Sequence, residues 1–585
     1  MAKIGRAGFF SYLIPYWKLV LLTMSLGVVS VLLGIINPYF AKLTIDNAYG
    51  NRDIKLFILL ASVGAAFFLI GNLLDFVKSD RSRLLSRKVN FDISRDLFKR
   101  LQDLPFAYHA DRSSGEYVYR LRNDTESVSA LLSDQIPRFP VLLFRFLAIV
   151  AVIFYLNWKL ALFALMLVPI SHIQSTLILR WIGNIARSKM AKIQKLFKNL
   201  HETFSHMHLI KSFGREKNEI KKFEAGLKDV MEAELKDARM TGVFNVSGAI
   251  LSKALSGVVV LFGGFQVIRG EMTLGSLTAI AIYVAQMMGL LKSIYDFYQN
   301  IVVGRVAEKR IGEILETEPS ICDSPGAADH IIETGSVEFR DVSFGYRKDA
   351  SVIDGISFLV EPYSKAAFVG LSGSGKTTMI SLISRLYEPG EGGIYIDGVD
   401  IKKIKLASLK SQTSIALQQS YLWNDTIANN ILYGAGGSTR QDMIEAAKLA
   451  EAHEFIIRSR DGYDSNVGEA GHSLSEGQKQ RIAIARAFIS KPRLLVLDEA
   501  MSSLDSETED KIIDNIKREF KDSTVIIVSH RLSTVEKMDM VYFLKDSSTM
   551  ESGTHEELVR KNLRYGELFA SQFKDTLSEE PAVFQ

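Results

Sequence analysis

The first half of the chain alternates long apolar runs with long charged stretches. A helix needs about 20 apolar residues to span a bilayer. Six runs come close to or exceed that length and are predicted to be membrane-spanning helices, over residues 19–40, 54–76, 139–156, 160–182, 246–268 and 274–298. A soluble helical core is the alternative, and six such runs in one chain argue against it.

The segments between these runs alternate in length and charge. Those after the first, third and fifth runs are short, whereas the other two have about sixty residues each and are rich in Lys and Arg. Basic loops stay on the cytoplasmic side of a membrane, so the long loops and both termini are expected there. The long loops are helical in pattern. They are interrupted at 111–116 and 205–214, where contact tips for a cytoplasmic domain are expected.

The second half changes to short β-rich runs, helical stretches and glycine-rich turns, which is typical of an α/β domain. The predicted fold is therefore an all-α, six-helix transmembrane domain with long cytoplasmic helix extensions, followed by an α/β domain. The predicted boundaries are an N-terminal cytoplasmic or elbow segment 1–18, a transmembrane domain 19–305, a linker 306–334, the α/β domain 335–572 and a flexible tail 573–585.

Composition changes this picture little. A chain of 585 residues is too long for one compact core, and a net charge of +4 is too small to indicate a nucleic-acid partner. The single cysteine, Cys322, excludes an intrachain disulfide and a cysteine-rich metal site. The first apolar run is too long for a signal-peptide core, so it is expected to remain as an uncleaved membrane helix.

Residues 370–378 match the phosphate-loop pattern G-x-x-x-x-G-K-[ST], between a buried strand run and a helical stretch. The glycines let backbone N–H groups turn toward phosphates, and the helix N-terminus adds partial positive charge. We expect Lys376 to reach the β- and γ-phosphates and the Thr377 hydroxyl to bind Mg²⁺. The α/β domain 335–572 is therefore predicted to be a P-loop nucleotide-binding domain. The candidate ATP-binding residues here are Gly370, Ser372, Gly373, Ser374, Gly375, Lys376, Thr377 and Thr378.

Two further apolar strand runs end in polar residues. The run 494–497 is followed by Asp498, placed to hold Mg²⁺, and by Glu499, placed to polarise the attacking water. The run 524–528 is followed by Ser529 and His530, and His530 is expected to contact the γ-phosphate.

Leu474 to Gln478 (LSEGQ) resembles the signature motif of ATP-binding-cassette proteins. The other motifs of that family follow in family order, and over nearly its whole length the chain resembles the exporter-type half-transporters, which include multidrug exporters and the bacterial lipid A flippase. The resemblance implies an adenine-stacking Tyr346, a Gln418 that senses Mg²⁺ and the membrane domain, a switch His530, a D-loop Asp505, and a signature (Ser475, Gly477, Gln478) that completes the ATP site of a second copy.

The same resemblance implies contacts that couple the two domains. The expected coupling residues are Gly115, Glu116, Lys211, Phe213 and Glu469. Two positions depart from the family pattern. Glu476 replaces the first glycine of the signature, and Met501 stands where a small or hydroxyl residue is common.

Polar and basic residues inside the predicted spans default to functional hypotheses. The candidate substrate-cavity residues are Arg145, His172, Lys253, Gln286 and Lys292. One interpretation is a cavity for an anionic amphiphile. The other, favoured as the commoner case, is that these side chains snorkel or pair with acids such as Asp296.

These features predict ATP-hydrolysis-driven export or flipping of a hydrophobic or amphiphilic substrate by alternating access in the cell (inner) membrane. The expected cofactors are ATP and Mg²⁺, and the expected partners are a second copy of the chain, membrane lipid and the substrate, without nucleic acid. An importer with the exporter fold, for example for a metal chelate, stays open, as do a peptide exporter and a heterodimer. A cassette ATPase without transport disagrees with the six spans.

Overall fold

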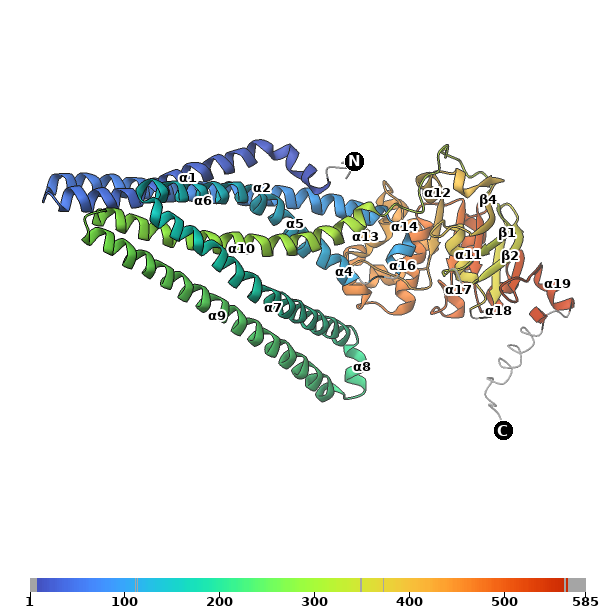
Figure 1. Cartoon of the computed structure of the whole chain (residues 1–585). Helices are drawn as coiled ribbons and strands as arrows, with labels where there is room; N and C mark the ends of the chain where they lie inside the picture. Colours follow the sequence, from blue (N-terminus) through green and yellow to red (C-terminus); the bar gives the residue numbers. More distant parts are fainter. Residues whose placement is uncertain are drawn as a thin grey trace. The chain divides into compact units, whose positions relative to one another are not determined.

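The computed structural model describes residues 8–110, 112, 114–347, 350–371, 373–561 and 564–566. The chain divides into two compact units (Figure 1). The helical unit lies within Met1–Gln102 and Ser113–Thr317. The mixed unit lies within Asp103–Arg112 and Glu318–Gln585. The predicted tail 573–585 falls outside the described residues.

Long helices dominate the helical unit: α1 (Trp17–Leu43), α2 (Ile54–Asp103), α6 (Ile136–Leu156), α7 (Trp158–Ser205), α9 (Glu216–Ile268) and α10 (Leu274–Glu316). Shorter segments join or extend them: η1 (Gly8–Tyr16), η2 (Thr44–Tyr49), α4 (Ser114–Tyr119), η3 (Arg120–Asp124), α5 (Thr125–Ala130), η4 (Leu131–Gln135) and α8 (Met207–Ser212). The predicted short loops correspond to the turns between α6 and α7 and between α9 and α10, and to the segment from η2 to α2.

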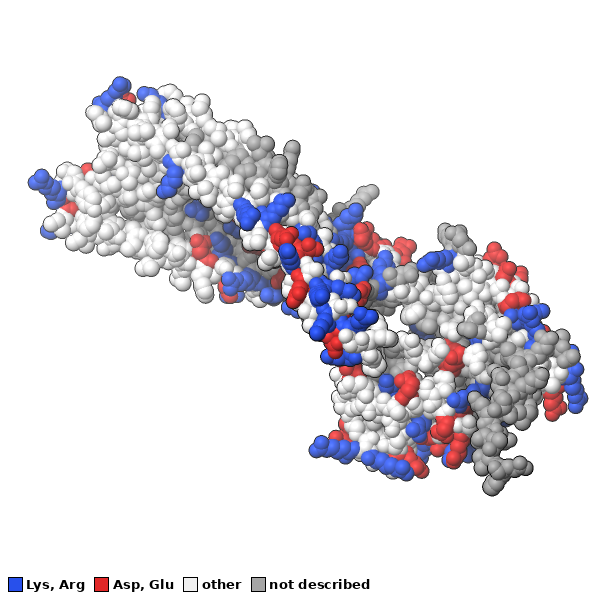
Figure 2. All heavy atoms as spheres, turned by 90° about the horizontal axis from the view of Figure 1, so that it is seen from below, with Lys and Arg blue, Asp and Glu red and all other residues white. Residues whose placement is uncertain are grey.

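Five stretches among the described residues are long and apolar enough to cross a membrane: Gly8–Tyr49, Ile54–Asp103, Ser114–Leu156, Glu216–Ile268 and Leu274–Glu316. The remaining predicted span, 160–182, lies in α7. Only its shorter part Trp158–Ile170 is found as an apolar helix, so this span stays a prediction. Figure 2 shows large uncharged areas on the helical unit, with charged side chains gathered along another part of it.

Two predicted boundaries differ in the structure. Helix α10 continues to Glu316, so the helical part ends near Thr317 and not at residue 305. Helix α2 ends at Asp103, eight residues before the predicted break at 111–116, because Pro105 lacks the N–H that a continuing helix requires. The segment Asp103–Arg112, with its short helix α3 (Phe106–Ala110), groups with the mixed unit.

Two sheets form the mixed unit. The six-stranded sheet has the order β10-β9-β3-β8-β7-β6, parallel except for β10, and the four-stranded antiparallel sheet has the order β2-β1-β4-β5. The strands are β1 (Val337–Phe344), β2 (Ile353–Val360), β3 (Lys365–Gly370), β4 (Glu391–Ile396), β5 (Val399–Asp400), β6 (Thr413–Ala416), β7 (Leu494–Asp498), β8 (Thr524–Val528), β9 (Met540–Leu544) and β10 (Met550–Gly553). Because β3, β8 and β7 are adjacent and parallel, their carboxyl ends meet at one edge.

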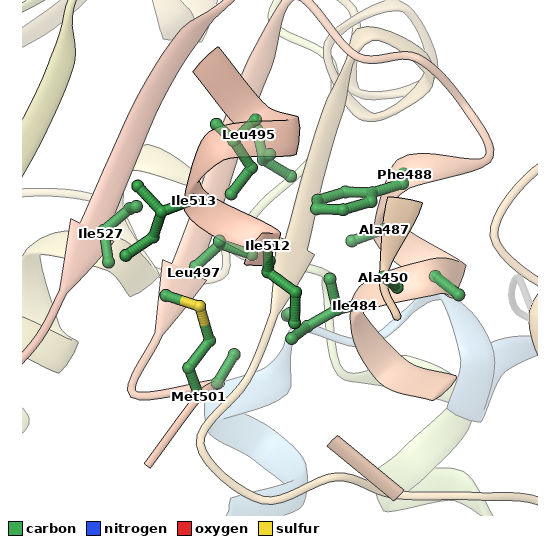
Figure 3. Packing of buried hydrophobic residues seen from close by; sticks show 14 of the residues in the cluster. Ala450, Ile484, Ala487, Phe488, Leu495, Leu497, Met501, Ile512, Ile513 and Ile527 are labelled. Carbon is green, nitrogen blue, oxygen red and sulfur yellow. The ribbon is translucent and has the colours of Figure 1, made fainter. Parts of the chain in front are cut away.

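Helices cover these sheets: α11 (Lys376–Ile383), α12 (Leu406–Gln412), α13 (Ile427–Leu432), α14 (Arg440–Leu449), α15 (His453–Arg458), α16 (Glu476–Phe488), α17 (Ser506–Glu519), α18 (Leu532–Glu536) and α19 (His555–Arg560). Figure 3 shows residues of α16 and α17 packed around β7, among them Ile484, Ile512 and Leu497. Met501 lies in this cluster and is 4% exposed. Its thioether fills core volume, which accounts physically for the departure from a small residue.

Candidate nucleotide-binding site

The phosphate loop joins the carboxyl end of β3 to the N-terminus of α11. Gly373 and Gly375 have φ of 80° and 106°, in the left-handed region that favours glycine. A Cβ at Gly370 would lie 2.4 Å from the Leu544 carbonyl oxygen, so no larger residue fits there. Lys376 Nζ donates to the carbonyl oxygens of Gly370 (2.8 Å) and Leu371 (2.9 Å). Ser372 lies outside the described residues.

Two polar atoms, one in the loop and one at the end of β7, lack partners among the described residues. Ser374 Oγ and Asp498 Oδ1 are both buried and make no hydrogen bond among the described residues. Burial lowers the pKa of Lys376, against the opposing effect of Glu499 and Asp498. Such unsatisfied buried groups are costly unless a ligand satisfies them. The cradle therefore fits a polyanion together with a cation.

Asp498 ends β7 at the same edge as the loop, and Glu499 directly follows it. Asp498 is 1% exposed. Burial raises its pKa to about 6, with a further contribution from Glu499, while a hydrogen bond to Thr377 and the charge of Lys376 act in the opposite direction. Glu499 has a φ of 46°, uncommon for a glutamate, and its N–H donates to the Val528 carbonyl at 3.1 Å. Such a backbone conformation is commonest at functional sites, which favours a functional role for Glu499.

Two side chains contact the Glu499 carboxylate. His530 Nε2 lies 2.9 Å from Oε1, and Gln418 Nε2 donates to Oε2 at 2.7 Å. His530 follows the end of β8, and Gln418 follows the end of β6. Three residues separated by up to 112 positions in the chain (530 − 418) thus meet at one carboxylate because their strands are parallel.

Tyr346 belongs to an aromatic cluster beside the loop. Its ring makes edge contacts with Phe344 and Tyr387, at centroid distances of 5.2 and 5.1 Å. Its hydroxyl lies 3.1 Å from Thr378 Oγ1. Tyr387 also contacts Phe106 of α3, with a centroid distance of 6.0 Å. The candidate adenine platform is therefore joined through Tyr387 to the segment Asp103–Arg112.

The signature residues form the N-terminus of α16. Ser475 Oγ accepts from the Gln478 N–H at 3.3 Å, and Gln478 Oε1 accepts from the Ser475 N–H at 3.0 Å, which is a capping box. Glu476 is exposed and lies 3.4 Å from Lys479 Nζ. A carboxylate in the first helical turn is electrostatically favourable, so this departure is compatible with the helix. Asp505 caps α17 by accepting from the Thr508 N–H and hydroxyl.

Three residues outside the predicted motifs, Gln480, Glu509 and Arg531, connect these loops. Gln480 donates to the Ser502 and Ser503 hydroxyls and accepts from the Ser503 N–H. From the other side, Arg531 donates to the Ser502 carbonyl and pairs with the buried Glu509. Gln480 and Arg531 lie next to recognised motifs, but the sequence alone does not indicate that both contact the loop at Ser502.

The expected coupling residues lie in three separate segments of the chain. Glu469 is exposed in the short turn Glu469–Gly471, and Phe213 is exposed directly after α8. Lys211 pairs with Glu216 at 3.0 Å. Gly115 and Glu116 belong to α4 in the helical unit, where Glu116 pairs with Arg120. The coupling role of Gly115 and Glu116 stays a prediction, and the neighbouring segment Asp103–Arg112 is the one that groups with the mixed unit.

Two of the candidate cavity residues line the same pocket. Arg145 of α6 and Gln286 of α10 share a cavity of about 350 Å³ with Asn37 of α1 and Asp75 of α2. Lys253 is exposed on α9 and is absent from this lining. The side chains of His172 and Lys292 lie outside the described residues.

Comparison with known proteins agrees with this geometry in both units. The family model described as the ABC transporter transmembrane region matches residues 18–291, and the model described as ABC transporter matches residues 353–502. An uncharacterized ABC transporter ATP-binding protein of Bacillus subtilis, YfiC, is 31% identical over 96% of this chain and 93% of its own length.

This chain belongs to the ABC transporter family.

Two further similarities concern the exporter branch of the ABC family. The ATP-dependent lipid A-core flippase of Syntrophus aciditrophicus is 30% identical over 93% of this chain and 90% of its own length. The structure of a bacterial Atm1-family ABC exporter with ATP bound matches with a TM-score of 0.85, at 28% identity, over 96% of this chain and 99% of that one. This ABC protein is therefore a multi-pass membrane transporter with a half-transporter fold. It binds ATP and couples its hydrolysis to export.

Proposed function

We propose that this transporter works as a dimer of identical subunits and exports an amphiphile with an anionic or strongly polar head group. The half-transporter fold typically dimerises. Each copy carries both a complete phosphate loop, with Lys376, and a signature with Ser475 and Gly477. Two identical copies can therefore supply every part of two ATP sites. A relative named as a lipid A-core flippase supports a lipid-like substrate.

The observation that carries the substrate proposal is the pocket between α1, α2, α6 and α10. Asn37 Oδ1 and Gln286 Oε1 line it, and both are buried oxygens without a hydrogen-bond partner among the described residues. No carboxylate of the described residues lies within 4 Å of the Arg145 guanidinium, and the nearby Asp75 pairs with Lys78 at 2.6 Å. A substrate with an anionic group and hydroxyl donors satisfies all three side chains.

At the ATP site we assign roles from geometry and family motif together. Glu499 acts as the base that orients and deprotonates the attacking water, and His530 and Gln418 hold its carboxylate in place. Lys376 and the loop N–H groups bind the phosphates. Thr377, Asp498 and Gln418 would hold Mg²⁺, whose contribution when bound is to neutralise charge on the β- and γ-phosphates. The unpartnered Asp498 Oδ1 supports this cation site.

We further infer that the protein lies in the cell (inner) membrane with both termini in the cytoplasm. The long basic loops support this orientation. The segment Asp103–Arg112, the tip with Lys211 and Phe213, and the loop with Glu469 transmit movement between the units. Phe106 supports the first of these roles, since it contacts Tyr387 beside the adenine platform.

The proposal is tested with Arg145→Gln in lipid nanodiscs. Anionic amphiphiles should stimulate the ATPase activity of the wild type, and the variant should lose most of that stimulation while keeping its basal rate. Lys253→Gln is the matched control, because it removes a cation from α9 outside the pocket. If both variants respond to the amphiphiles like the wild type, Arg145 does not bind the substrate.

A further inference from the structure

A second pocket in the helical unit lies between residues of three long helices, α1, α2 and α6. It has a volume of about 420 Å³ and is lined by α1, α2 and the segment from α5 to α6. Its cations are Lys78, Arg83 and Arg138, and its one carboxylate is Asp134. Serine and threonine hydroxyls, including those of Thr23 and Ser82, complete the polar lining. A cavity of this size is in the range of small-ligand sites.

Helix geometry places this pocket at the level of the inner-leaflet head groups, given the orientation proposed above. At 1.5 Å per residue, Arg138, Thr23 and Lys78 lie roughly 27, 30 and 36 Å from the external ends of their helices. The hydrocarbon core is about 30 Å thick, with the head groups beyond it. The three values, roughly 27 to 36 Å, lie around the inner boundary of the hydrocarbon core, which is where the head groups begin.

Charge pairing distinguishes two of the cations from their neighbours. Along the same stretch of α2, Lys78, Arg81 and Arg87 each lie within 4 Å of a carboxylate, those of Asp75, Asp80 and Glu126. No carboxylate of the described residues lies within 4 Å of Arg83 or Arg138. Asp134 is already held by Ser82 Oγ (3.4 Å) and Gln135 Nε2 (2.8 Å). The pocket thus offers two guanidinium groups to an external anion.

We propose that this pocket binds the phosphate of an anionic phospholipid from the cytoplasmic leaflet. Guanidinium groups match phosphate oxygens geometrically, and basic pockets between spanning helices on the cytoplasmic side recognise such head groups. Exposed apolar side chains on the same helices, including Leu22, Phe76 and Phe139, provide surface for the acyl chains. The site is distinct from the Arg145 pocket, which lies closer to the external ends of the helices.

The test is lipid binding by the purified full-length chain, measured by native mass spectrometry with phosphatidylglycerol or phosphatidylcholine. Each cation near an anionic surface is worth about 1 kcal/mol, or roughly fivefold in affinity. The wild type should prefer phosphatidylglycerol, and Arg83→Gln with Arg138→Gln should weaken its binding roughly 25-fold. The charge-conserving pair Arg83→Lys with Arg138→Lys should retain most of the preference and shows that the fold tolerates change at both positions.

Arg81→Gln is the matched control, because it removes a guanidinium from the same turn of α2 without touching the pocket lining. Equal binding of the two lipids by the wild type would overturn the proposal, and so would equal loss in the control. Displacement of phosphatidylglycerol by millimolar glycerol 3-phosphate would assign the site to soluble phosphate esters instead, whereas no displacement supports the lipid. ATP turnover of the same samples reports on the ATP site separately, so a loss of lipid binding is distinguishable from a loss of activity.

Discussion

Glu499 illustrates how much a single side chain depends on its surroundings. Its carboxylate contacts His530 and Gln418, and its backbone adopts a left-handed conformation at the end of β7. Residues held in such conformations persist where the surrounding structure determines them, often at functional sites. The geometry and the family motif therefore point to the same base.

Glu499→Gln is expected to lower ATP turnover by roughly 10²–10⁴-fold, because the amide keeps the shape but cannot accept a proton. Steady-state ATPase assays and equilibrium nucleotide binding on the purified chain measure both effects, and ATP affinity should change little. Glu507→Gln, at an exposed carboxylate that pairs with Lys511, is the control. Turnover close to that of the wild type would remove Glu499 from the role of base.

Asp498→Asn is expected to raise thermal stability in EDTA at pH 8 while abolishing stabilisation by Mg²⁺ and ATP. The folded state binds the proton of this buried carboxyl more tightly than the unfolded state, since its pKa is about 6 instead of 3.8. The wild type therefore loses stability as pH rises from 3.8 through about 6, by up to about 3 kcal/mol. The asparagine variant does not share that loss.

Melting curves in EDTA at pH 5 and pH 8 test whether the buried charge of Asp498 lowers stability. The gain in Tm of the Asp498→Asn variant should be larger at pH 8. Asp461→Asn, at an exposed aspartate, should shift Tm equally at both values. A larger gain at pH 5 would show that the buried charge is not the cause.

At the scale of elements, a single proline determines where α2 ends. Pro105 ends the helix and starts the segment Asp103–Arg112, which groups with the mixed unit. Within that segment, Phe106 contacts Tyr387, which also contacts Tyr346. A contiguous aromatic path thus leads from this segment to the candidate adenine platform.

Phe106→Ala is expected to lower the amount of substrate transported per ATP hydrolysed. The lost edge-to-face contact is worth about 1 kcal/mol, so the KM for ATP should rise no more than about fivefold. Transport and ATPase assays on the same proteoliposomes give the ratio. Phe98→Ala removes an exposed ring from α2 and serves as the control. An unchanged ratio in both variants would show that this path does not couple the two activities.

At the scale of the whole molecule, the proposed dimer predicts that defects in different motifs complement each other. A Lys376→Ala chain has a defective phosphate loop, and a Ser475→Arg chain has a defective signature at the N-terminus of α16. If each ATP site takes its loop from one copy and its signature from the other, a mixed dimer contains one site with both parts intact.

Co-purified mixtures of these two variants, carrying different affinity tags, should therefore recover ATP turnover that neither variant shows alone. Two chains with the same defect, co-purified in the same way, provide the control. Failure to recover turnover in confirmed mixed dimers would contradict sites shared between identical copies.

Much of this protein is determined by its sequence alone, because the signals are local. Apolar length predicts the spans, and glycine spacing predicts the phosphate loop. Carboxylates after an apolar strand predict the positions of Asp498 and Glu499, since each of these depends on neighbours within a few residues. The membrane class and the two-domain order followed from such local patterns, and the ABC family followed from the resemblance of the motifs. The comparisons confirm all three.

Tertiary structure decided what depends on residues far apart in the chain. Parallel pairing of β3, β8 and β7 brings His530 to Glu499, and packing alone explains why Met501 is accepted in the core. Local patterns also do not show that Gln480 and Arg531 both contact Ser502, or that Arg83 and Arg138 have no carboxylate partner among the described residues. Hydropathy indicates which residues avoid water, whereas only the folded structure shows which polar groups have hydrogen-bond or ion-pair partners.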